Sequence, residues 1–302
     1  MPRPAVIALF GPTGVGKTAV AIALAQALRE RGEDPVGVSA DALQLYRHLE
    51  TLTGAPTRSD QAALEHRLVS VLSLQATFSA GQYAQRAHDE IDGLLAAGRR
   101  PIVVGGTGLY LRAALTDLSM RPPPLPGSRE RWTAELERVG PRALHALLRQ
   151  RAPGAAARVD PGDRQRIIRA LELLDAGELE PVQEESQLWT DAVRHPTLLV
   201  GLVMERSQLY DRIERRVDAM LAAGAQEEVR RAAEAGVSPT VAKALGFQEL
   251  LSNDLAGMKR RSRQYARRQL TWMRKLSGIR VMDVTGREAG AVAADVLELW
   301  LA

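Results

Sequence analysis

The sequence predicts an α/β protein with a parallel sheet core, helices on both faces of the sheet, and an inserted helical domain. Short apolar runs bounded by glycine or proline alternate with longer segments of helical periodicity, as in parallel sheets. The proline-rich stretch RPPPLPGS at 121–128 ends this alternation, and the sequence from there to about residue 176 has helical character alone. Strand-type sequence returns near residue 197. We therefore expect a core domain formed by 1–120 and 196–302, and an insertion at 121–195.

Individual elements follow from apolar runs and capping residues. The predicted strands are 6–10, 36–39, 68–72, 101–106 and 197–204. The predicted core helices are 17–31, a helix that Ser79 caps and Gly98 ends, 207–223 and 258–276. The segment GELEPVQEESQ at 177–187 is predicted to be a loop or linker.

Composition excludes several classes of protein. The chain has 302 residues, of which 45% are hydrophobic and 25% charged, so extensive disorder is excluded. The absence of cysteine excludes disulfides, thiolate zinc sites and cysteine nucleophiles, and the five histidines lack metal-ligand spacing. The first apolar run is too short for a signal peptide or a membrane span. We expect a cytoplasmic protein without membrane contact.

The segment GPTGVGKT matches the phosphate-loop pattern and lies between a predicted strand and a predicted helix. In such loops, backbone N–H groups converge on phosphate oxygens, the lysine adds positive charge and the threonine hydroxyl binds Mg²⁺. We therefore expect a P-loop NTPase or kinase-like core and a magnesium ligand at Thr18. The residues predicted to bind phosphate are Gly11, Pro12, Thr13, Gly14, Val15, Gly16, Lys17 and Thr18. The loop alone does not distinguish ATP from another diphosphate.

Most phosphate-loop proteins have a second apolar strand that ends in an aspartate, which helps to hold Mg²⁺. The best candidate strand here, 101–106, continues into GGTGLY and has no acidic residue at its end. Asp41, after the strand at 36–39, is the candidate carboxylate. It could act as a base or as a metal ligand, or it could simply cap a helix.

The helix at 258–276 contains eight lysines and arginines and no acidic residue. Arg260, Arg263, Arg267 and Arg274 fall on one helical face, with aromatic residues interleaved, which is typical of a helix bound to a nucleic-acid backbone. A solvated surface or a membrane-surface contact is the alternative. A second arginine cluster, DPGDRQRIIRALE at 160–172, lies near the end of the insertion. Together the two clusters favour an RNA or DNA substrate.

In this order, the motifs resemble those of the tRNA dimethylallyltransferases, also called tRNA isopentenyltransferases. The matching segments are GPTGVGKT, SADALQLYRHLETLTGAPT, HRLVSV, FSAGQY, VGGTGLYLRAAL, DPGDRQRIIRALE, LYDRIERRVDAML, KALGFQEL and RRQLTWMRK, which span about 11–275. The phosphate loop is common to many families, whereas VGGTGLY, RALE and RQLTWMR in this order are specific.

The resemblance implies that the loop holds the diphosphate of dimethylallyl diphosphate rather than ATP. The implied acceptor is the exocyclic amino nitrogen of the adenosine next to the anticodon, on its 3′ side, in tRNAs that read codons beginning with U. The resemblance also implies that this base is flipped out of the stack into a channel. The implied products are isopentenyladenosine and diphosphate, the implied cofactor is Mg²⁺, and the protein is expected to be a monomer that binds the tRNA anticodon stem-loop.

The resemblance also assigns roles to single residues. Asp41 would orient and deprotonate the amino group, Thr107 would line the channel, and Arg216 would reach the diphosphate. The residues implied to contact tRNA are Asp41, Ala42, Leu43, Gln44, Thr107, Gln165, Arg166, Ile167, Ile168, Arg169, Lys243, Ala244, Leu245, Gly246, Phe247, Gln248, Arg267, Arg268, Gln269, Trp272 and Arg274. Gln44 is expected to bond to an edge of the adenine.

Three positions depart from the family pattern. Ala42 replaces the usual serine, Leu52 replaces a glycine, and Ala55 replaces a lysine that lies near the phosphates in relatives, so diphosphate binding here is expected to depend more on Arg216. Two other functions remain open. A small-molecule kinase would explain the loop and Asp41 but not the basic helix, and an RNA-binding switch protein would leave Asp41 and Thr107 without a role.

Overall fold

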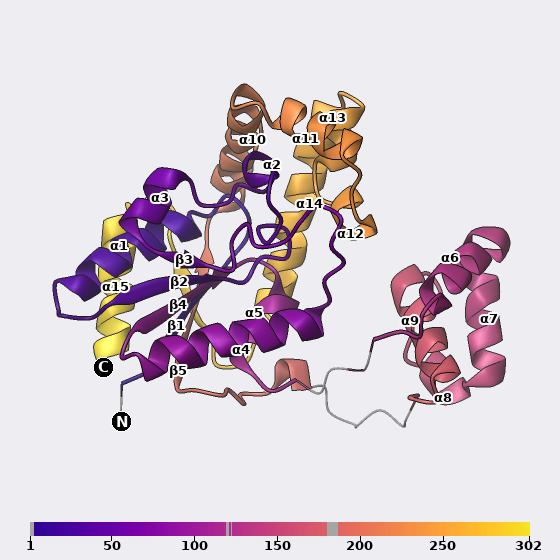
Figure 1. The fold of residues 1–302 in the computed structure, drawn as a ribbon. Coiled ribbons are helices and arrows are strands. Elements are labelled where there is room, and N and C mark those ends of the chain that lie inside the picture. Colours follow the sequence, from indigo (N-terminus) through magenta and orange to yellow (C-terminus); the bar gives the residue numbers. More distant parts are fainter. Residues whose placement is uncertain (1–2, 119–120, 122, 180–186) are drawn as a thin grey trace. The chain divides into compact units, whose positions relative to one another are not determined.

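Six parallel strands form one sheet, in the order β3-β2-β4-β1-β5-β6 (Figure 1). The structure is a computed structural model, and it describes all residues except 1–2, 119–120, 122 and 180–186. The strands are β1 (Val6–Phe10), β2 (Pro35–Ser39), β3 (His66–Arg67), β4 (Arg100–Gly105), β5 (Thr197–Val203) and β6 (Arg280–Asp283). The α/β class predicted from the sequence is confirmed.

The helices of the sheet domain come in two groups along the chain. Those before the insertion are α1 (Lys17–Arg29), α2 (Glu50–Thr53), α3 (Arg58–Ala63), α4 (Ala80–Ala96) and α5 (Gly108–Leu115). Those after it are α10 (Arg206–Ala222), α11 (Ala225–Glu234), α12 (Pro239–Ala242), α13 (Phe247–Leu251), α14 (Leu255–Met273) and α15 (Ala289–Leu301). A short 3₁₀ turn covers Gln187–Trp189.

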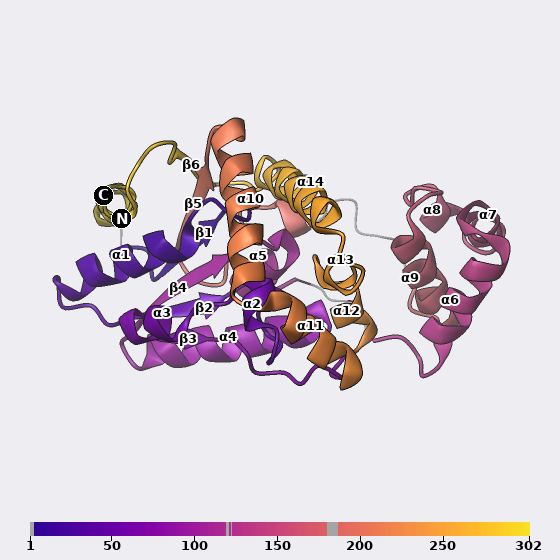
Figure 2. The same cartoon turned by 90° about the horizontal axis from the view of Figure 1, so that it is seen from above.

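The core of the sheet lies around β1, whose residues are all buried because strands pair with it on both sides. Ile7 is in register with Ile102 of β4 and Leu198 of β5. Helices α1 and α15 pack together on one face of the sheet, and α4 and α5 pack together on the other (Figure 1). Helices α10 and α14 also pack against each other (Figure 2).

The predicted third strand, 68–72, does not form. Pairing with β2 stops at Arg67, because Leu68 and Ser70 have φ angles of 58° and 50°, which no extended strand allows. Only an isolated bridge joins Leu72 to Tyr46 farther on. By contrast, Ser79 caps α4 as predicted: its hydroxyl accepts a hydrogen bond from the Gln82 N–H, while the Gln82 side chain accepts one from the Ser79 N–H.

The chain divides into two compact units: one formed by Met1–Leu118 and Gln187–Ala302, the other by Ser119–Ser186. Residues 187–195, which the sequence interpretation placed in the insertion, belong to the first unit. There the Arg194 N–H donates to the Leu115 carbonyl (2.9 Å), and its guanidinium pairs with Asp92 (2.9 Å). Most of the predicted linker at 177–187 lies outside the described residues.

The second unit has its own apolar core, formed by α6 (Ser128–Val139), α7 (Pro141–Arg151), α8 (Pro153–Ala156) and α9 (Arg164–Asp175). One charged group, Glu172, is fully buried within it. Burial alone would raise the pKa of Glu172, but hydrogen bonds from Arg129 (2.6 and 2.9 Å) and Arg169 (3.1 Å) lower it overall. Across both units, none of the described helices is long and apolar enough to span a bilayer.

Candidate active site

A pocket of about 1270 Å³ lies at the carboxyl ends of β1, β2 and β4. Ligands of open parallel sheets bind at this edge, because the loops after the strands converge there. The loop after β1 is the phosphate loop, the loop after β2 begins with Asp41, and the loop after β4 contains Thr107. Helices α10 and α14 supply a large part of the remaining wall, and residues of α2 and α3 also line it.

The phosphate loop turns at two glycines with left-handed backbone, Gly14 (φ 84°) and Gly16 (φ 104°). The Lys17 ammonium lies over the loop and donates to the carbonyls of Gly11 (2.9 Å) and Pro12 (3.1 Å). Five of the eight predicted phosphate-binding residues line the pocket, namely Thr13, Gly14, Gly16, Lys17 and Thr18. The other three, Gly11, Pro12 and Val15, are buried beneath the loop and support its shape.

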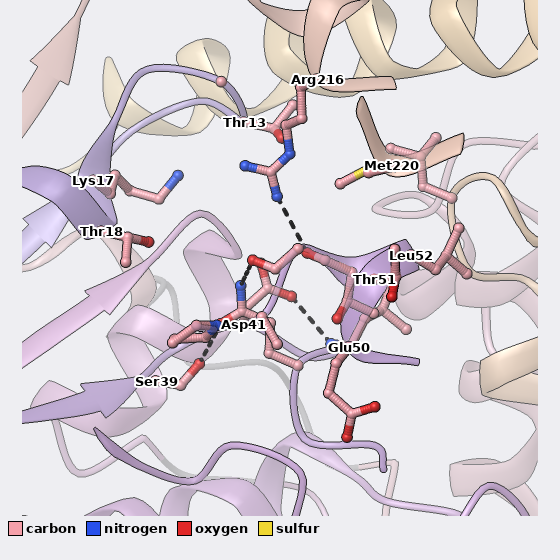
Figure 3. Close-up of a pocket in the computed structure, with 18 of the residues that line it drawn as sticks. Thr13, Lys17, Thr18, Ser39, Asp41, Glu50, Thr51, Leu52, Arg216 and Met220 are labelled. Atoms are coloured by element: carbon pink, nitrogen blue, oxygen red, sulfur yellow. Dashed lines mark hydrogen bonds between the residues drawn. The ribbon is translucent and has the colours of Figure 1, made fainter. Parts of the chain in front are cut away.

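Two cations and one carboxylate face one another across the pocket: Lys17, Arg216 and Asp41 (Figure 3). Burial lowers the pKa of Lys17 to about 8; the charge of Asp41 opposes this shift and that of Arg216 adds to it. Burial also lowers the pKa of Arg216, again with Asp41 in opposition. Both cations are held partly out of water, and among the described residues Asp41 is the carboxylate whose charge opposes both pKa shifts, so the pocket is suited to bind an anion.

Arg216 reaches the pocket from α10, and its Nη2 donates to the Thr53 carbonyl (3.3 Å; Figure 3). The next residue, Gly54, leaves the space that this guanidinium occupies. A Cβ atom on Gly54 would lie 1.9 Å from Arg216 Nη2, and the φ angle of Gly54 is +58°. Glycine at position 54 therefore leaves the space that this position of Arg216 needs, and its left-handed backbone favours glycine as well.

Asp41 does not cap a helix, because the residues after it form turns. Its Oδ1 accepts the Leu43 N–H (3.1 Å), which orients the carboxylate within the pocket, and both Ala42 and Leu43 line that pocket. The Gln44 side chain is used within the protein: its Oε1 accepts from the Ser39 hydroxyl (3.1 Å) and its Nε2 donates to the Gly54 carbonyl (3.3 Å). Bonding of Gln44 to a base, as predicted, would require replacement of these two bonds.

Thr107 is the residue before α5, and its side chain makes no capping bond. Its hydroxyl instead lies 3.4 Å from the hydroxyl of Tyr265, which comes from α14. Burial, with the charge of Asp41, raises the pKa of Tyr265 to about 12, so the phenol stays protonated as a donor. The sequence interpretation used Tyr265 only as an aromatic residue of the basic helix and missed its place in the pocket.

Gln269, predicted to contact tRNA, is buried in the protein at 4% exposure. Its Oε1 accepts the Thr13 N–H (2.8 Å) and its Nε2 donates to the Gly106 carbonyl (2.8 Å). One amide thus joins the phosphate loop, the loop after β4 and α14. Its side chain is not available to RNA, because both ends already have partners in the interior.

The basic helix is partly neutralised by its neighbours. Lys259 pairs with Asp218 of α10 (2.7 Å), Arg261 with Glu249, and Arg263 with Glu214. Among the predicted RNA contacts on this helix, Arg267 Nε donates to the Tyr210 hydroxyl (2.8 Å), Trp272 packs against Trp189 with ring centroids 4.8 Å apart, and Arg274 is exposed. Arg268 lines the pocket.

Several other predicted RNA contacts have buried side chains. Ala244 and Phe247 are buried in the sheet unit, and Ile167 and Ile168 are buried in the core of the helical unit. Apolar periodicity places them inward, so they position exposed neighbours rather than face a ligand. The exposed members of the two segments are Gln165, Arg166, Lys243 and Gln248, while Arg169 is half-buried, Leu245 lines the pocket and Gly246 is buried.

The described residues contain no group of three or more acidic, histidine or cysteine side chains that could hold a metal ion by itself. Thr13, Thr18 and Asp41 are among the side chains with oxygen atoms that line the pocket near the phosphate loop (Figure 3). Mg²⁺ commonly binds through one or two protein oxygens and substrate phosphates, so this donor set fits it only together with a phosphate ligand.

Comparison with known proteins shows the family of this chain. The family model described as IPP transferase matches residues 44–276. The tRNA dimethylallyltransferase of Symbiobacterium thermophilum is 38% identical over 94% of this chain and 90% of its own length. The crystal structure of the tRNA isopentenylpyrophosphate transferase of Bacillus halodurans superposes with a TM-score of 0.68 and 29% identity, covering 99% of this chain and 95% of that one.

A eukaryotic dimethylallyltransferase acting on tRNA superposes with a TM-score of 0.75 and 25% identity, covering 93% of this chain and 74% of that one. The relatives and solved structures match over 93–99% of this chain, whereas the family model begins at residue 44, after the phosphate loop, and includes the basic helix. The chain belongs to the IPP transferase family.

Proposed function

We propose that this protein transfers the dimethylallyl group of dimethylallyl diphosphate to the exocyclic amino nitrogen of the adenosine that follows the anticodon in tRNA. The observation that carries the proposal is the pocket in which Lys17 and Arg216 of an anion site face the carboxylate of Asp41. Family membership supports the reaction, since relatives are named for it.

The geometry suits displacement of diphosphate by an amine. The amino nitrogen attacks the allylic carbon, the carbon–oxygen bond breaks, and its electron pair leaves with the diphosphate. The proton that the nitrogen loses passes to the Asp41 carboxylate, whose Oδ1 is held by the Leu43 N–H. The Lys17 ammonium, the Arg216 guanidinium and the loop N–H groups offset the charge that grows on the leaving group.

Thr18 would hold Mg²⁺ together with the diphosphate, which leaves the Asp41 carboxylate free to act as the base. A bound Mg²⁺ would supply further charge neutralisation of the leaving diphosphate. Thr107 and Tyr265 present hydroxyls beside Asp41 in the same pocket and would orient the base that carries the amine. Exposed cations of α14, together with exposed residues of α9, would bind the RNA backbone, since phosphate contacts fix register without reading sequence.

The proposed acceptor is an anticodon stem-loop, and the protein is proposed to act as a cytoplasmic monomer. The test incubates the protein with Mg²⁺, labelled dimethylallyl diphosphate and a stem-loop bearing adenosine on the 3′ side of the anticodon. We expect label in the RNA with the wild type and at least a hundredfold less with Asp41→Asn, which preserves the bond to Leu43 but removes the base. No label in RNA, together with phosphoryl transfer from ATP to a small alcohol, would identify a kinase instead.

A further inference from the structure

A second arginine of α10, Arg212, lies against the phosphate loop one helical turn before Arg216. A Cβ atom placed on Gly16 would lie 3.2 Å from Arg212 Nη2, and one placed on Gly14 would lie 3.0 Å from Ile213 Cγ1. Helix α10 therefore crosses directly over the two glycines of the loop. Residues four apart share a helical face, so Arg212 and Arg216 both line the pocket.

The guanidinium of Arg212 has no hydrogen bond or ion pair among the residues that the structure describes. Other arginines of α10 and α14 do have partners: Arg216 donates to the Thr53 carbonyl, and Arg263 pairs with Glu214. Arginine carries five N–H donors in a planar fork that matches phosphate oxygens. The Arg212 guanidinium, which lies beside the glycines of the phosphate loop without a partner among the described residues, is thus complementary to an anion held by that loop.

The places of the two arginines also differ in depth. Arg216 is half-buried near Asp41, where the allylic carbon must lie to meet the acceptor amine, whereas Arg212 is exposed at the rim beside Gly16. A diphosphate bound with its carbon end toward Asp41 would place its ester-linked phosphate near Arg216. Its terminal phosphate would then lie nearer the rim.

We propose that Arg212 is a further substrate-binding residue, which contacts the terminal phosphate of the diphosphate and forms a clamp with Arg216. This inference rests on the proposed function. It predicts that Arg212 discriminates diphosphates from monophosphates, because a monophosphate in the same orientation has no group that reaches the rim.

The test measures binding of dimethylallyl diphosphate and of dimethylallyl monophosphate, each with Mg²⁺, by titration calorimetry with the 302-residue chain. The variant is Arg212→Gln. The matched control is Arg215→Gln, on the same helix, whose exposed side chain does not line the pocket and whose Nε donates to the Asp211 carbonyl (3.3 Å). We expect Arg212→Gln to weaken diphosphate binding at least tenfold and to raise the KM for dimethylallyl diphosphate in parallel. Binding of the monophosphate, and the KM for the stem-loop, should match those of Arg215→Gln.

Equal diphosphate affinities for Arg212→Gln and Arg215→Gln would overturn the inference and leave the proposed function intact. An increase confined to the KM for the stem-loop would also overturn it, by showing that Arg212 contacts RNA. A wild-type protein that binds no diphosphate at all would instead overturn the proposed function, and the clamp with it.

Discussion

Replacement of Gly54 by alanine should displace Arg216 and reduce turnover without a large loss of stability. The added Cβ would lie 1.9 Å from Nη2 and 2.7 Å from Cζ of Arg216. Ordinary contacts begin near 3.4 Å, so the guanidinium must move by about 1.5 Å, which exceeds the tolerance of a hydrogen bond. The end of an arginine side chain moves easily, so the clash itself costs little folding free energy.

The magnitude follows from the role of Arg216. Loss of one preorganised donor to a developing anion lowers turnover by roughly 10²–10³-fold. We expect Gly54→Ala to lower kcat by about 10–100-fold, since the displaced arginine still contributes charge. The left-handed backbone of Gly54 (φ +58°) adds a stability cost of about 1–2 kcal/mol for any side chain.

Gly32→Ala is the matched control, because Gly32 also has a left-handed backbone (φ +81°), but a Cβ atom added there would meet no other atom within 4 Å. Thermal unfolding and the prenyl-transfer assay should be measured for both variants. Similar losses of Tm, with loss of turnover for Gly54→Ala alone, are expected. Equal turnover for the two variants would refute the crowding argument. A double mutant, Gly54→Ala/Arg216→Gln, gives a second test. If its loss of turnover equals the product of the losses of the two single mutants, the two positions act independently, which would also refute the crowding argument.

Three further predictions concern other parts of the molecule. Gln269→Leu removes two buried hydrogen bonds and should lower the free energy of unfolding by about 2–4 kcal/mol, and Tm by roughly 5–10 °C. The control Gln264→Leu, at a more exposed position of the same helix, should leave Tm within about a degree. Equal Tm values for the two variants would contradict the internal role of Gln269. The pKa of Lys17, lowered to about 8, predicts two opposite trends between pH 8 and 10.5. Diphosphate affinity should fall as pH rises, because the Lys17 ammonium loses its proton. The free energy of unfolding should rise with pH, because Lys17 of the unfolded chain holds more protons than Lys17 of the folded chain. Calorimetry would measure the affinity and denaturant unfolding the stability, each against pH and each compared with Lys17→Gln. Affinity and stability that change in the same direction with pH would refute this prediction. Glu172→Gln removes the negative charge that pairs with Arg129 and should destabilise the helical unit by about 2 kcal/mol. Hydrogen exchange should become faster in α6 and α9 but not in the sheet. Unchanged exchange in these helices would contradict the role of the pair.

Local pattern accounts for much of what could be predicted from the sequence. β1 and β5 are continuous apolar runs and formed as expected, and α1 begins at the lysine of the phosphate loop. The run at 68–72 has the same apolar character, yet the positive φ of Leu68 ends the strand, and φ is not visible in composition.

The site shows a similar division. The position of Arg212 was accessible in principle, since it stands four residues before Arg216 on a predicted helix. The inward direction of Gln269 was not, because its partner Thr13 is 256 residues away in sequence. Only the tertiary fold decides which polar residues of a basic helix face the protein.

The interruption of the sheet unit by the helical unit has a consequence for synthesis on the ribosome. The central strand β1 pairs with β4, made before residues 119–186, and with β5, made after them. At translation rates of about 5–20 residues per second, one side of β1 waits on the order of several seconds for its partner. The helical unit has local contacts and a separate core, so we expect it to fold first. Chains that end before residue 197 and have been released from the ribosome should then resist protease in the helical unit but not in the sheet, and the reverse pattern would contradict this order.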